Sequence, residues 1–233
     1  MREKLFFVLI FIFFCDVVWA EINIEKEIDL TLTNKYDRVL KYTALANSNI
    51  SFLFNDIFTV TGGVSVGGNN SYTQTLLFAS GELSFKFLNR FFKYIFLNIL
   101  YTFEGIKKYY LNTNAIIYTA SIKGKYGGFS LGFHNLWSIY YDEYKIKESG
   151  LAFMGYVTVL NKKQFALDLV FANYDLLYAT AYFGAYFLGI NTLWKVNKNV
   201  AVNNDLNVYQ SGSAGLTSTF YGISLNSGVK ISW

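Results

Sequence analysis

The sequence predicts an all-β fold: an antiparallel up-and-down transmembrane β-barrel of twelve strands, with ten strands as the alternative count. The first observation is an alternation of apolar and polar residues along most of the chain. The second is composition, because the chain has 19 Tyr and 23 Phe, which favour strands, and no Pro, which interrupts them. The third is that no apolar stretch after residue 20 approaches the roughly 20 residues that a transmembrane helix needs.

Successive side chains of a strand point to opposite faces, so each alternating segment has an apolar face and a polar face. We expect strands at about residues 25–34, 42–54, 57–66, 76–88, 91–103, 112–122, 127–140, 150–160, 165–174, 178–194, 199–209 and 217–233. Unpaired backbone groups cannot face lipid, so a membrane protein without spanning helices must close these strands into a barrel.

In the first half of the chain, the apolar faces carry aliphatic and aromatic side chains. These faces are Ile28, Leu30 and Leu32; Phe58, Val60, Val64 and Val66; Leu83, Phe85 and Phe87; and Ile116, Tyr118, Ala120 and Ile122. Segments 25–34 and 42–54 alternate more weakly, and segment 91–103 is ambiguous in its face. The count becomes ten if the first two segments merge or lie outside the wall.

The alternation is clearer in the second half. The apolar faces are Phe129, Leu131, Phe133, Trp137 and Ile139; Leu151, Phe153, Val157 and Val159; Phe165, Leu167, Leu169 and Phe171; Val200, Val202, Leu206 and Val208; and Tyr221, Ile223, Leu225, Val229, Ile231 and Trp233. Segment 178–194 is apolar on both faces. The polar faces are rich in Gly, Ser, Thr and Asn, which suits a narrow lumen better than a solvated surface. A secreted β-sandwich or lipocalin-like barrel is the alternative, because it alternates too.

The connections alternate in kind along the chain. Short stretches rich in Asn, Asp, Gly and Lys predict tight turns at 55–56, 89–90, 123–125, 161–163 and 196–198. Between them lie the connections near 35–41, 67–74, 104–111, 142–149, 174–177 and 210–216. An even strand count places both termini on one side with the tight turns, which would be the periplasmic side.

Residues 1–20 have the pattern of a removable secretory signal peptide. Arg2 and Lys4 precede an apolar run over 5–14, and Ala20 offers a small residue at the expected cleavage site. The predicted organisation is therefore a signal peptide at 1–20 and one barrel domain at 21–233, with an uncleaved anchor helix as the alternative. Cys15, the single cysteine, leaves with the signal peptide.

The final seven residues carry the most specific motif. Ser227, Gly228, Ile231 and Trp233 read polar, Gly, hydrophobic and final aromatic at the spacing 227–233. This pattern resembles the closing-strand signal of bacterial integral outer-membrane β-barrel proteins, which the barrel-assembly machinery recognises. The resemblance implies a place in the bacterial outer membrane, with lipid as a partner. At twelve strands the chain is similar in size to small substrate-selective channels of the porin-like class.

Composition excludes several other functions. The formal net charge is only +4, and Arg38 and Arg90 are the only arginines after residue 20, which argues against nucleic-acid binding. One His and one Cys exclude an ordinary zinc site, and the acidic stretch 142–148 contains two lysines, so we expect a solvated loop rather than a calcium site. We expect no cofactor. The oligomeric state stays open.

His134 is the only candidate for catalysis. It shares a predicted face with Ser130, Gly132 and Ser138. Outer-membrane phospholipases use a His–Ser pair, and their spacing of two residues on one strand fails here because positions 132 and 136 are Gly and Leu. We therefore expect no enzyme, and a histidine that is hydrogen-bonded within the lumen.

The polar faces give a set of candidate pore-lining residues. They are Asp29, Glu82, Lys86, His134, Asp168, Asn203, Asp205, Asn207, Asn226 and Lys230. Charged and dipolar side chains in a narrow pore set its preference for ions and solutes. The sequence therefore predicts an outer-membrane channel for passive diffusion of small hydrophilic solutes or ions. Pairing of opposite charges such as Glu82 and Lys86 would instead close a small barrel.

The second functional hypothesis is a non-conducting surface protein whose outer loops bind a host, a protein or a ligand. Its best candidates are Tyr109, Tyr110 and the cluster at 140–144. Most predicted outer connections are under about ten residues, which is little surface against the roughly 800 Å² per side of a standard protein interface. These tyrosines also fit the aromatic girdle of a membrane barrel.

Overall fold

The computed structural model describes residues 23–38, 41–86, 92–106, 111–140, 144–174, 185–211 and 219–233. The predicted signal peptide at 1–20 lies outside these residues. No helix in the described ranges is long and apolar enough to span a membrane.

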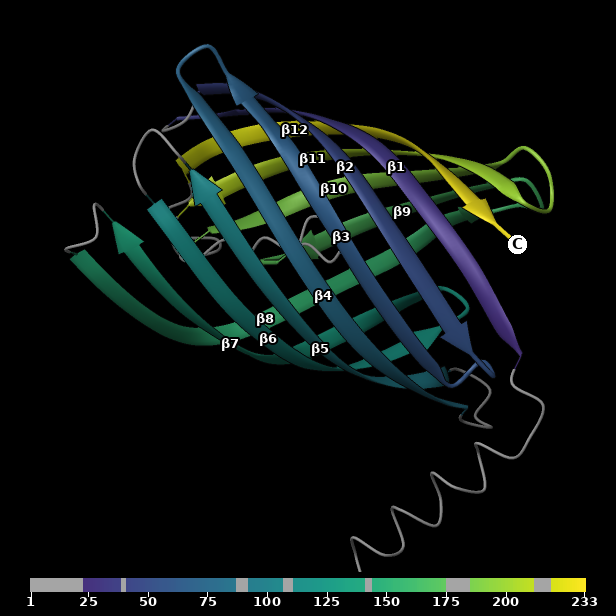
Figure 1. The fold of residues 1–233 in the computed structure, drawn as a ribbon. Helices are drawn as coiled ribbons and strands as arrows, with labels where there is room; N and C mark the ends of the chain where they lie inside the picture. Colours follow the sequence, from purple (N-terminus) through teal and green to yellow (C-terminus); the bar gives the residue numbers. More distant parts are fainter. Residues whose placement is uncertain are drawn as a thin grey trace, which may run out of the picture.

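The described residues form twelve strands. They are β1 (Ile24–Asp37), β2 (Lys41–Phe54), β3 (Phe58–Asn69), β4 (Tyr72–Lys86), β5 (Phe92–Ile106), β6 (Leu111–Gly124), β7 (Gly127–Tyr140), β8 (Tyr144–Asn161), β9 (Phe165–Ala172), β10 (Ala185–Lys195), β11 (Val200–Ser211) and β12 (Thr219–Ser232). Each strand pairs antiparallel with its sequence neighbours, and the ribbons are strongly tilted across the molecule (Figure 1).

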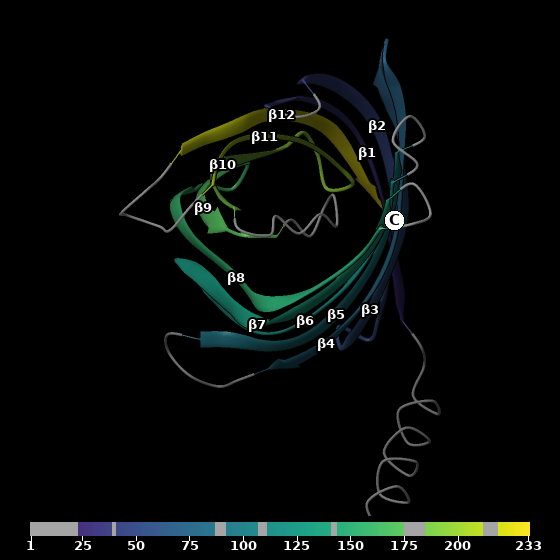
Figure 2. The same cartoon turned by 90° about the vertical axis from the view of Figure 1, so that its left-hand side faces the viewer.

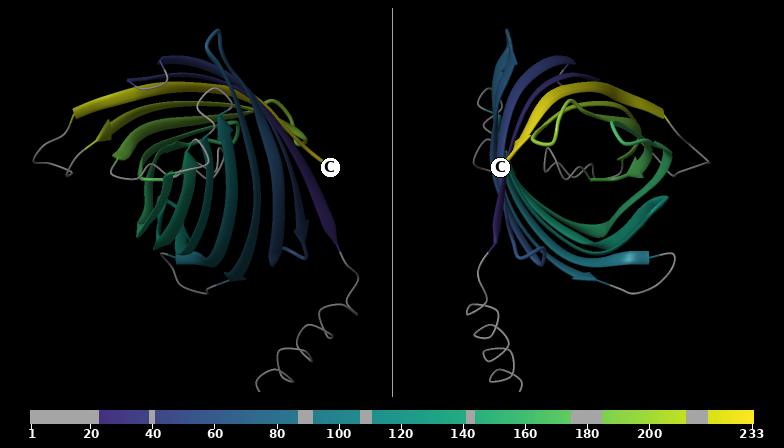
Figure 3. Two further views of the ribbon diagram at one scale, coloured as in Figure 1. Left: turned by 60° about the vertical axis from the view of Figure 1, so that its left-hand side comes forward. Right: turned by 90° about the vertical axis from the view of Figure 1, so that its right-hand side faces the viewer.

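The sheet closes on itself, with β1 hydrogen-bonded to β12. The closure continues to the edge of the wall, where Lys26 and Trp233 exchange two backbone hydrogen bonds of 3.0 and 2.9 Å. Figure 2 and Figure 3 show the strands arranged around a common axis. The prediction of a closed twelve-strand antiparallel barrel is confirmed. The count of ten is wrong, because β1 and β2 are both members of the wall.

The two ends of the barrel differ. At one end, which we call the turn end, β1 begins, β12 finishes, and the connections 55–57, 125–126, 162–164 and 196–199 lie. The predicted turn at Asn55 and Asp56 is confirmed: both residues have positive φ, 50° and 56°, and Ile57 N donates to Phe54 O at 3.0 Å. Two consecutive left-handed residues match the right-handed twist of the flanking strands, and Asn and Asp tolerate this conformation best among non-glycine residues.

At the opposite end, which we call the loop end, the strands run further than the sequence predicts. Residues 67–74 form a loop in the prediction, whereas β3 and β4 extend to a connection of only Asn70 and Ser71. Asn69 Oδ1 accepts hydrogen bonds from the backbone N–H groups of Ser71 at 2.7 Å and Tyr72 at 3.2 Å, which closes this turn. Asp37 and Glu104, predicted in loops, consequently lie within β1 and β5.

The apolar faces of the strands point outward and the polar faces point inward. In β12, Ile223, Leu225, Val229 and Ile231 are each 38–48% exposed, whereas Ser224 and Asn226 are buried. This is the reverse of a soluble barrel, which buries its apolar side chains, and it is the arrangement of a barrel surrounded by lipid. The soluble β-sandwich or lipocalin-like alternative is therefore not supported by the exposure pattern.

Aromatic side chains border the outer surface near both ends. Exposed Trp194, Trp233 and Tyr126 lie near the turn end. Near the loop end, the hydroxyl groups of Tyr42 and Tyr101 each donate to an asparagine on the neighbouring strand at 2.7 Å. Aromatic belts at both membrane–water interfaces are typical of transmembrane barrels.

Candidate functional site: the inner wall of the barrel

The predicted pore-lining residues lie on the inner face wherever the structure describes their side chains. Asn226, Asn207, Asp205, Asp29, His134 and Asn203 are all buried, and Glu82, Asp168 and Lys230 are partly buried. Lys86 pairs with Tyr94 in the β4–β5 register, but its side chain is outside the described set. The location therefore agrees with the sequence analysis, while the role as a pore lining stays a prediction.

Four of the inward residues form one continuous cross-strand row. Asp168 pairs with Asn191, Asn191 with Asp205, and Asp205 with Asn226. Neighbouring strands are about 4.8 Å apart, so the two aspartates are separated by about 10 Å of backbone. We call Asp168, Asn191, Asp205 and Asn226 the acid–amide row. It alternates carboxylate and amide groups from β9 to β12.

Sequence reasoning missed Asn191. Its segment was predicted to be apolar on both faces, so no polar face was assigned there. Residue spacing could have indicated it, because alternate residues of a strand lie on the same face. Asn191 is therefore on the same face as Phe187, whose side chain is buried.

Many oxygen atoms on this side of the wall lack a hydrogen-bond partner among the described residues. They include one or both side-chain polar atoms of Asp168, Asn191, Asn203, Asn207 and Asn226, together with Asp29 Oδ2 and Asn49 Oδ1. Buried polar groups are normally paired with protein or ordered water, because an unpaired group costs about 1–3 kcal/mol. This side of the wall is therefore suited to water or a polar solute.

Glycines make room for the inward amides. A Cβ on Gly189 would lie 2.3 Å from Oδ1 of its cross-strand partner Asn207, and a Cβ on Gly228 would lie 2.8 Å from Oδ1 of its partner Asn203. Both distances are far below van der Waals contact. The amides of Asn207 and Asn203 thus lie across the neighbouring strand rather than projecting freely into the interior.

The opposite side of the inner wall carries an apolar patch among its polar residues. Leu76, Phe78, Leu100, Ile117 and Ala152, from β4 to β8, form a buried cluster with Tyr174. The prediction of polar inner faces is therefore correct for β7, β11, β12, β1 and β2 but incomplete for β4, β5, β6 and β8, which supply the apolar cluster. The physical reason is that side chains fill part of a small barrel's interior, and filling favours close-packed apolar groups.

A cavity of about 530 Å³ lies in the half of the barrel nearer the turn end. We call it the turn-end cavity. Its wall includes the carboxylates of Glu82, Asp168 and Asp205, the amides of Asn191 and Asn207, and the aromatic rings of Phe96, Tyr156 and Phe187. Lys123 and Lys125 line its edge at the turn end, and both are exposed. The cavity thus combines a carboxylate-bearing interior with aromatic surfaces.

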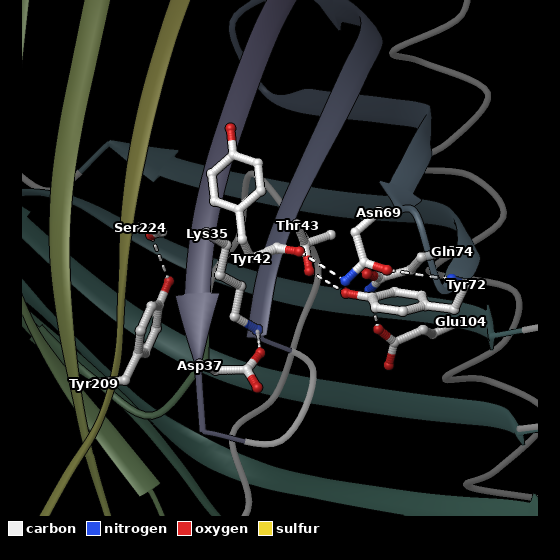
Figure 4. Close-up of polar contacts among 10 residues, drawn as sticks. All are labelled: Lys35, Asp37, Tyr42, Thr43, Asn69, Tyr72, Gln74, Glu104, Tyr209 and Ser224. Carbon is white, nitrogen blue, oxygen red and sulfur yellow. Dashed lines mark hydrogen bonds and ion pairs between the residues drawn. The ribbon is translucent and has the colours of Figure 1, made fainter. Parts of the chain in front are cut away.

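A second polar cluster lies on the inner wall near the loop end (Figure 4). Lys35 Nζ is 3.5 Å from Asp37 Oδ2 and 5.7 Å from the centre of the Tyr209 ring. Glu104 accepts a hydrogen bond from Gln74 and interacts electrostatically with Lys35. Asp37 is only 1% exposed, so the carboxylate of this ion pair is shielded from solvent.

The same cluster is extended by hydroxyl groups. Thr43 and Tyr72 share a hydrogen bond across β2 and β4, and Tyr209 and Ser224 share one of 2.9 Å (Figure 4). Sequence reasoning missed Lys35 and Asp37 because it ended the first strand at residue 34. Continuing the odd-numbered polar face of Asp29, Thr31 and Thr33 would have included both.

The remaining inward charges are locally paired near the turn end. Thr31 Oγ1 donates to Asp29 Oδ1 at 2.8 Å, and Asp29 faces Lys230 in the β1–β12 register. Lys230 Nζ also lies 3.0 Å from Glu27 Oε1. Across the described residues, the buried carboxylates are those of Asp29, Asp37 and Asp205.

His134 lies against the neighbouring strand β8. Its ring sits over Gly150, where a Cβ would be 2.9 Å from its carbon Cε1, and it is hydrogen-bonded to the backbone of Leu151. Ser130 and Ser138 lie four residues away on the same strand, which corresponds to about 13 Å of extended chain. No His–Ser pair forms within β7.

The residues of the predicted assembly motif occupy both faces of β12. Gly228 is buried on the inner face, whereas Ser227, Ile231 and Trp233 are exposed on the outer face. Trp233 is more than half exposed, at the edge of the turn end. Recognition of this motif by the assembly machinery stays a prediction. No group of three or more His, Cys, Asp or Glu that could hold a metal ion occurs in the part of the chain that the structure describes.

Comparison with known proteins finds no matching protein family and no similar curated sequence. Solved structures do match. The NanC porin is 11% identical with a TM-score of 0.57, and the alignment covers 87% of this chain and 98% of that one. Outer membrane phospholipase A from Escherichia coli, in the form of an active-site mutant, is 7% identical with a TM-score of 0.51, covering 91% of this chain and 92% of that one.

A third match, the outer membrane protein Omp33 of Acinetobacter baumannii, has 12% identity and a TM-score of 0.44, with 90% and 99% of the two chains covered. At these identities the likeness concerns the fold, and folds of this kind host unrelated functions. The chain is an all-β, closed twelve-strand barrel whose structural neighbours are bacterial outer-membrane β-barrel proteins.

Proposed function

We propose that this protein is a channel of the bacterial outer membrane through which small hydrophilic solutes or ions diffuse passively. The observation that carries the proposal is the polarity of the two faces. The outer surface exposes aliphatic side chains around the barrel, while carboxylate and amide oxygens without partners among the described residues line one side of the interior. Such oxygens can replace part of the hydration shell of a passing solute.

The proposed route to the membrane follows from the sequence. The segment at 1–20 would direct export, and the motif at 227–233 would be read by the barrel-assembly machinery. Lipid would then surround the apolar surface. No cofactor is required, because the proposed function is diffusion and involves no bond making.

Filtering would be electrostatic as well as steric. Among the Asp, Glu, His, Lys and Arg side chains of the described residues, three aspartates and one histidine are buried, and the nearly buried Lys35 is paired with one of these aspartates, Asp37. Fixed negative charge attracts cations and repels anions in a narrow, low-dielectric passage. The proposed channel should therefore prefer cations.

A non-conducting surface protein is the second candidate. The apolar cluster around Tyr174, which is 1% exposed, occupies part of the interior and favours a closed barrel. In that case the connections at the loop end would carry the function.

Planar-bilayer recording separates the two candidates. The full chain is expressed in a bacterial host, purified from its outer membrane, and checked for a mobility difference between unboiled and boiled samples. Discrete, reproducible conductance steps are expected for a channel. Silence from folded and inserted protein would contradict the channel and favour the surface protein.

A further inference from the structure

The turn-end cavity has an uneven distribution of charge. Glu82, Asp168 and Asp205 come from β4, β9 and β11, so they reach the cavity from well-separated parts of the wall. The lysines of the lining, Lys123 and Lys125, are exposed at its edge, and Lys125 Nζ lies 4.9 Å from the centre of the Tyr126 ring. The deeper part of the cavity is therefore acidic.

Amide oxygens in the same lining lack partners among the described residues. Asn207 is 3% exposed, and its Oδ1 has no hydrogen-bond partner within the described ranges. Oδ1 of Asn191 and Oδ1 of Asp168 also have no hydrogen-bond partner among the described residues. Acceptors of this kind require a hydrogen-bond donor, and an ammonium group supplies three donors and no acceptor.

Aromatic side chains complete the lining. Tyr156 lies opposite Gly128 and Val170 in the register and lines the cavity, and its hydroxyl oxygen has no partner among the described residues. Phe187 lines the cavity from β10 and is buried. Aromatic faces attract organic cations through their quadrupole and also contact the carbon chain of such a ligand.

We propose that the turn-end cavity is a binding site for a small organic cation that carries one or two ammonium groups. Asp168 and Asp205 supply the counter-charges, Asn191 and Asn207 accept hydrogen bonds, and Tyr156 and Phe187 contact the apolar part. This inference names the solute class of the proposed channel and rests on that function. A volume of about 530 Å³ is within the range of roughly 300–1,000 Å³ typical of small-molecule sites.

The geometry favours an organic cation over a bare metal ion. The described residues contain no group of three or more carboxylate, imidazole or thiolate ligands close enough to hold a metal. Asp168 and Asp205 are also separated by Asn191, at about 10 Å of backbone, which suits two ammonium groups on one chain better than one ion between them.

Titration calorimetry in detergent tests the proposal with 1,4-diaminobutane as the probe. The full-chain protein is purified from outer membranes, and each variant is checked for the mobility difference between unboiled and boiled samples. Saturable binding to the wild type is expected. Asp168→Asn and Asp205→Asn, which keep the side-chain shape, should each weaken the affinity about tenfold, because each removes one charge-assisted hydrogen bond.

Asp56→Asn is the matched control. It removes one negative charge in an exposed turn at a positive φ that Asn also tolerates, so it should leave the affinity unchanged. Succinate and 1,4-butanediol test charge at equal chain length, and both should bind at least about tenfold more weakly than the diamine. Absence of diamine binding, equal binding by either analogue, or unchanged affinity in both aspartate variants would overturn the inference.

The failure of this site and the failure of the channel are distinguishable. Diamine binding that depends on Asp168 and Asp205 in a barrel that never conducts would support the site and reject conduction. Conductance steps without any diamine binding or current block would reject the site and leave the channel intact.

Discussion

The amide of Asn207 lies directly across Gly189 on the neighbouring strand, where a Cβ would be 2.3 Å from the Asn207 Oδ1 atom. The two residues are direct partners in the β10–β11 register. The space above Gly189 therefore fixes where one acceptor of the turn-end cavity points. This relationship joins the backbone register to the chemistry of the cavity.

Gly189→Ala should displace the Asn207 amide without preventing folding, because the atom in conflict is the end of a flexible side chain. We expect altered diamine affinity and altered single-channel conductance. Gly62→Ala is the control, since a Cβ there meets nothing closer than 3.9 Å. If Gly189→Ala and Gly62→Ala leave both quantities equally unchanged, the position of the Asn207 amide is irrelevant to the site.

Lys35→Met should destabilise the barrel, because it removes the cation that faces the buried carboxylate of Asp37. Breaking a buried ion pair on one side costs about 3 kcal/mol. The measurement is the urea dependence of unfolding in detergent or lipid, with Lys35→Met/Asp37→Asn as the control that removes both charges. The double variant should recover much of the lost stability; a double variant less stable than Lys35→Met would contradict a stabilising pair.

The outward direction of the apolar faces predicts a cost that depends on depth in the membrane. Leu225, near the middle of β12, is 48% exposed, and Leu225→Lys should cost about 2–4 kcal/mol in lipid. Ile24→Lys, at the turn end of β1, should cost about 0–1 kcal/mol. Unfolding experiments in lipid vesicles measure both. Equal costs at the two positions would show that this surface does not face the bilayer centre.

The edge contact between Lys26 and Trp233 predicts an effect on assembly. Removing Trp233 deletes the two outermost backbone hydrogen bonds between β12 and β1, together with the aromatic residue of the assembly motif. We expect a sharp loss of protein in the outer membrane, measured on isolated membranes. Trp194→Ala, an exposed aromatic substitution near the same end, should have a smaller effect; similar losses in both variants would point to general destabilisation instead.

The fold could be predicted almost entirely from the sequence, because a period of two residues is easily recognised where one face is aliphatic. β7 has the predicted bounds, Gly127–Tyr140. The errors lie at the loop end, where polar residues continue both faces of β3 and β4 and the sequence pattern resembles a loop. There the two strands continue to Asn69 and Tyr72 because their backbones stay paired. The pattern of side chains does not reveal this pairing.

The candidate site was only partly predictable, because a face assignment places a residue on the wall but not beside its neighbours. The sequence pattern placed Asp168, Asp205 and Asn226 on the inner face, whereas their grouping with Asn191 depends on the register between four strands. The apolar cluster around Leu100 and Tyr174 was not predicted. Where a strand has aliphatic residues on both faces, the sequence pattern cannot tell which face points into the barrel.

Reversal potential in a potassium chloride gradient tests whether the barrel is a cation-selective channel, since it reports conduction and the sign of the charge along the path. For protein purified from outer membranes, we expect discrete channels whose reversal potential lies on the cation-selective side. The double variant Asp168→Asn/Asp205→Asn should shift that potential toward zero. Folded, inserted protein that passes no current, or channels that prefer chloride, would contradict a cation-selective channel.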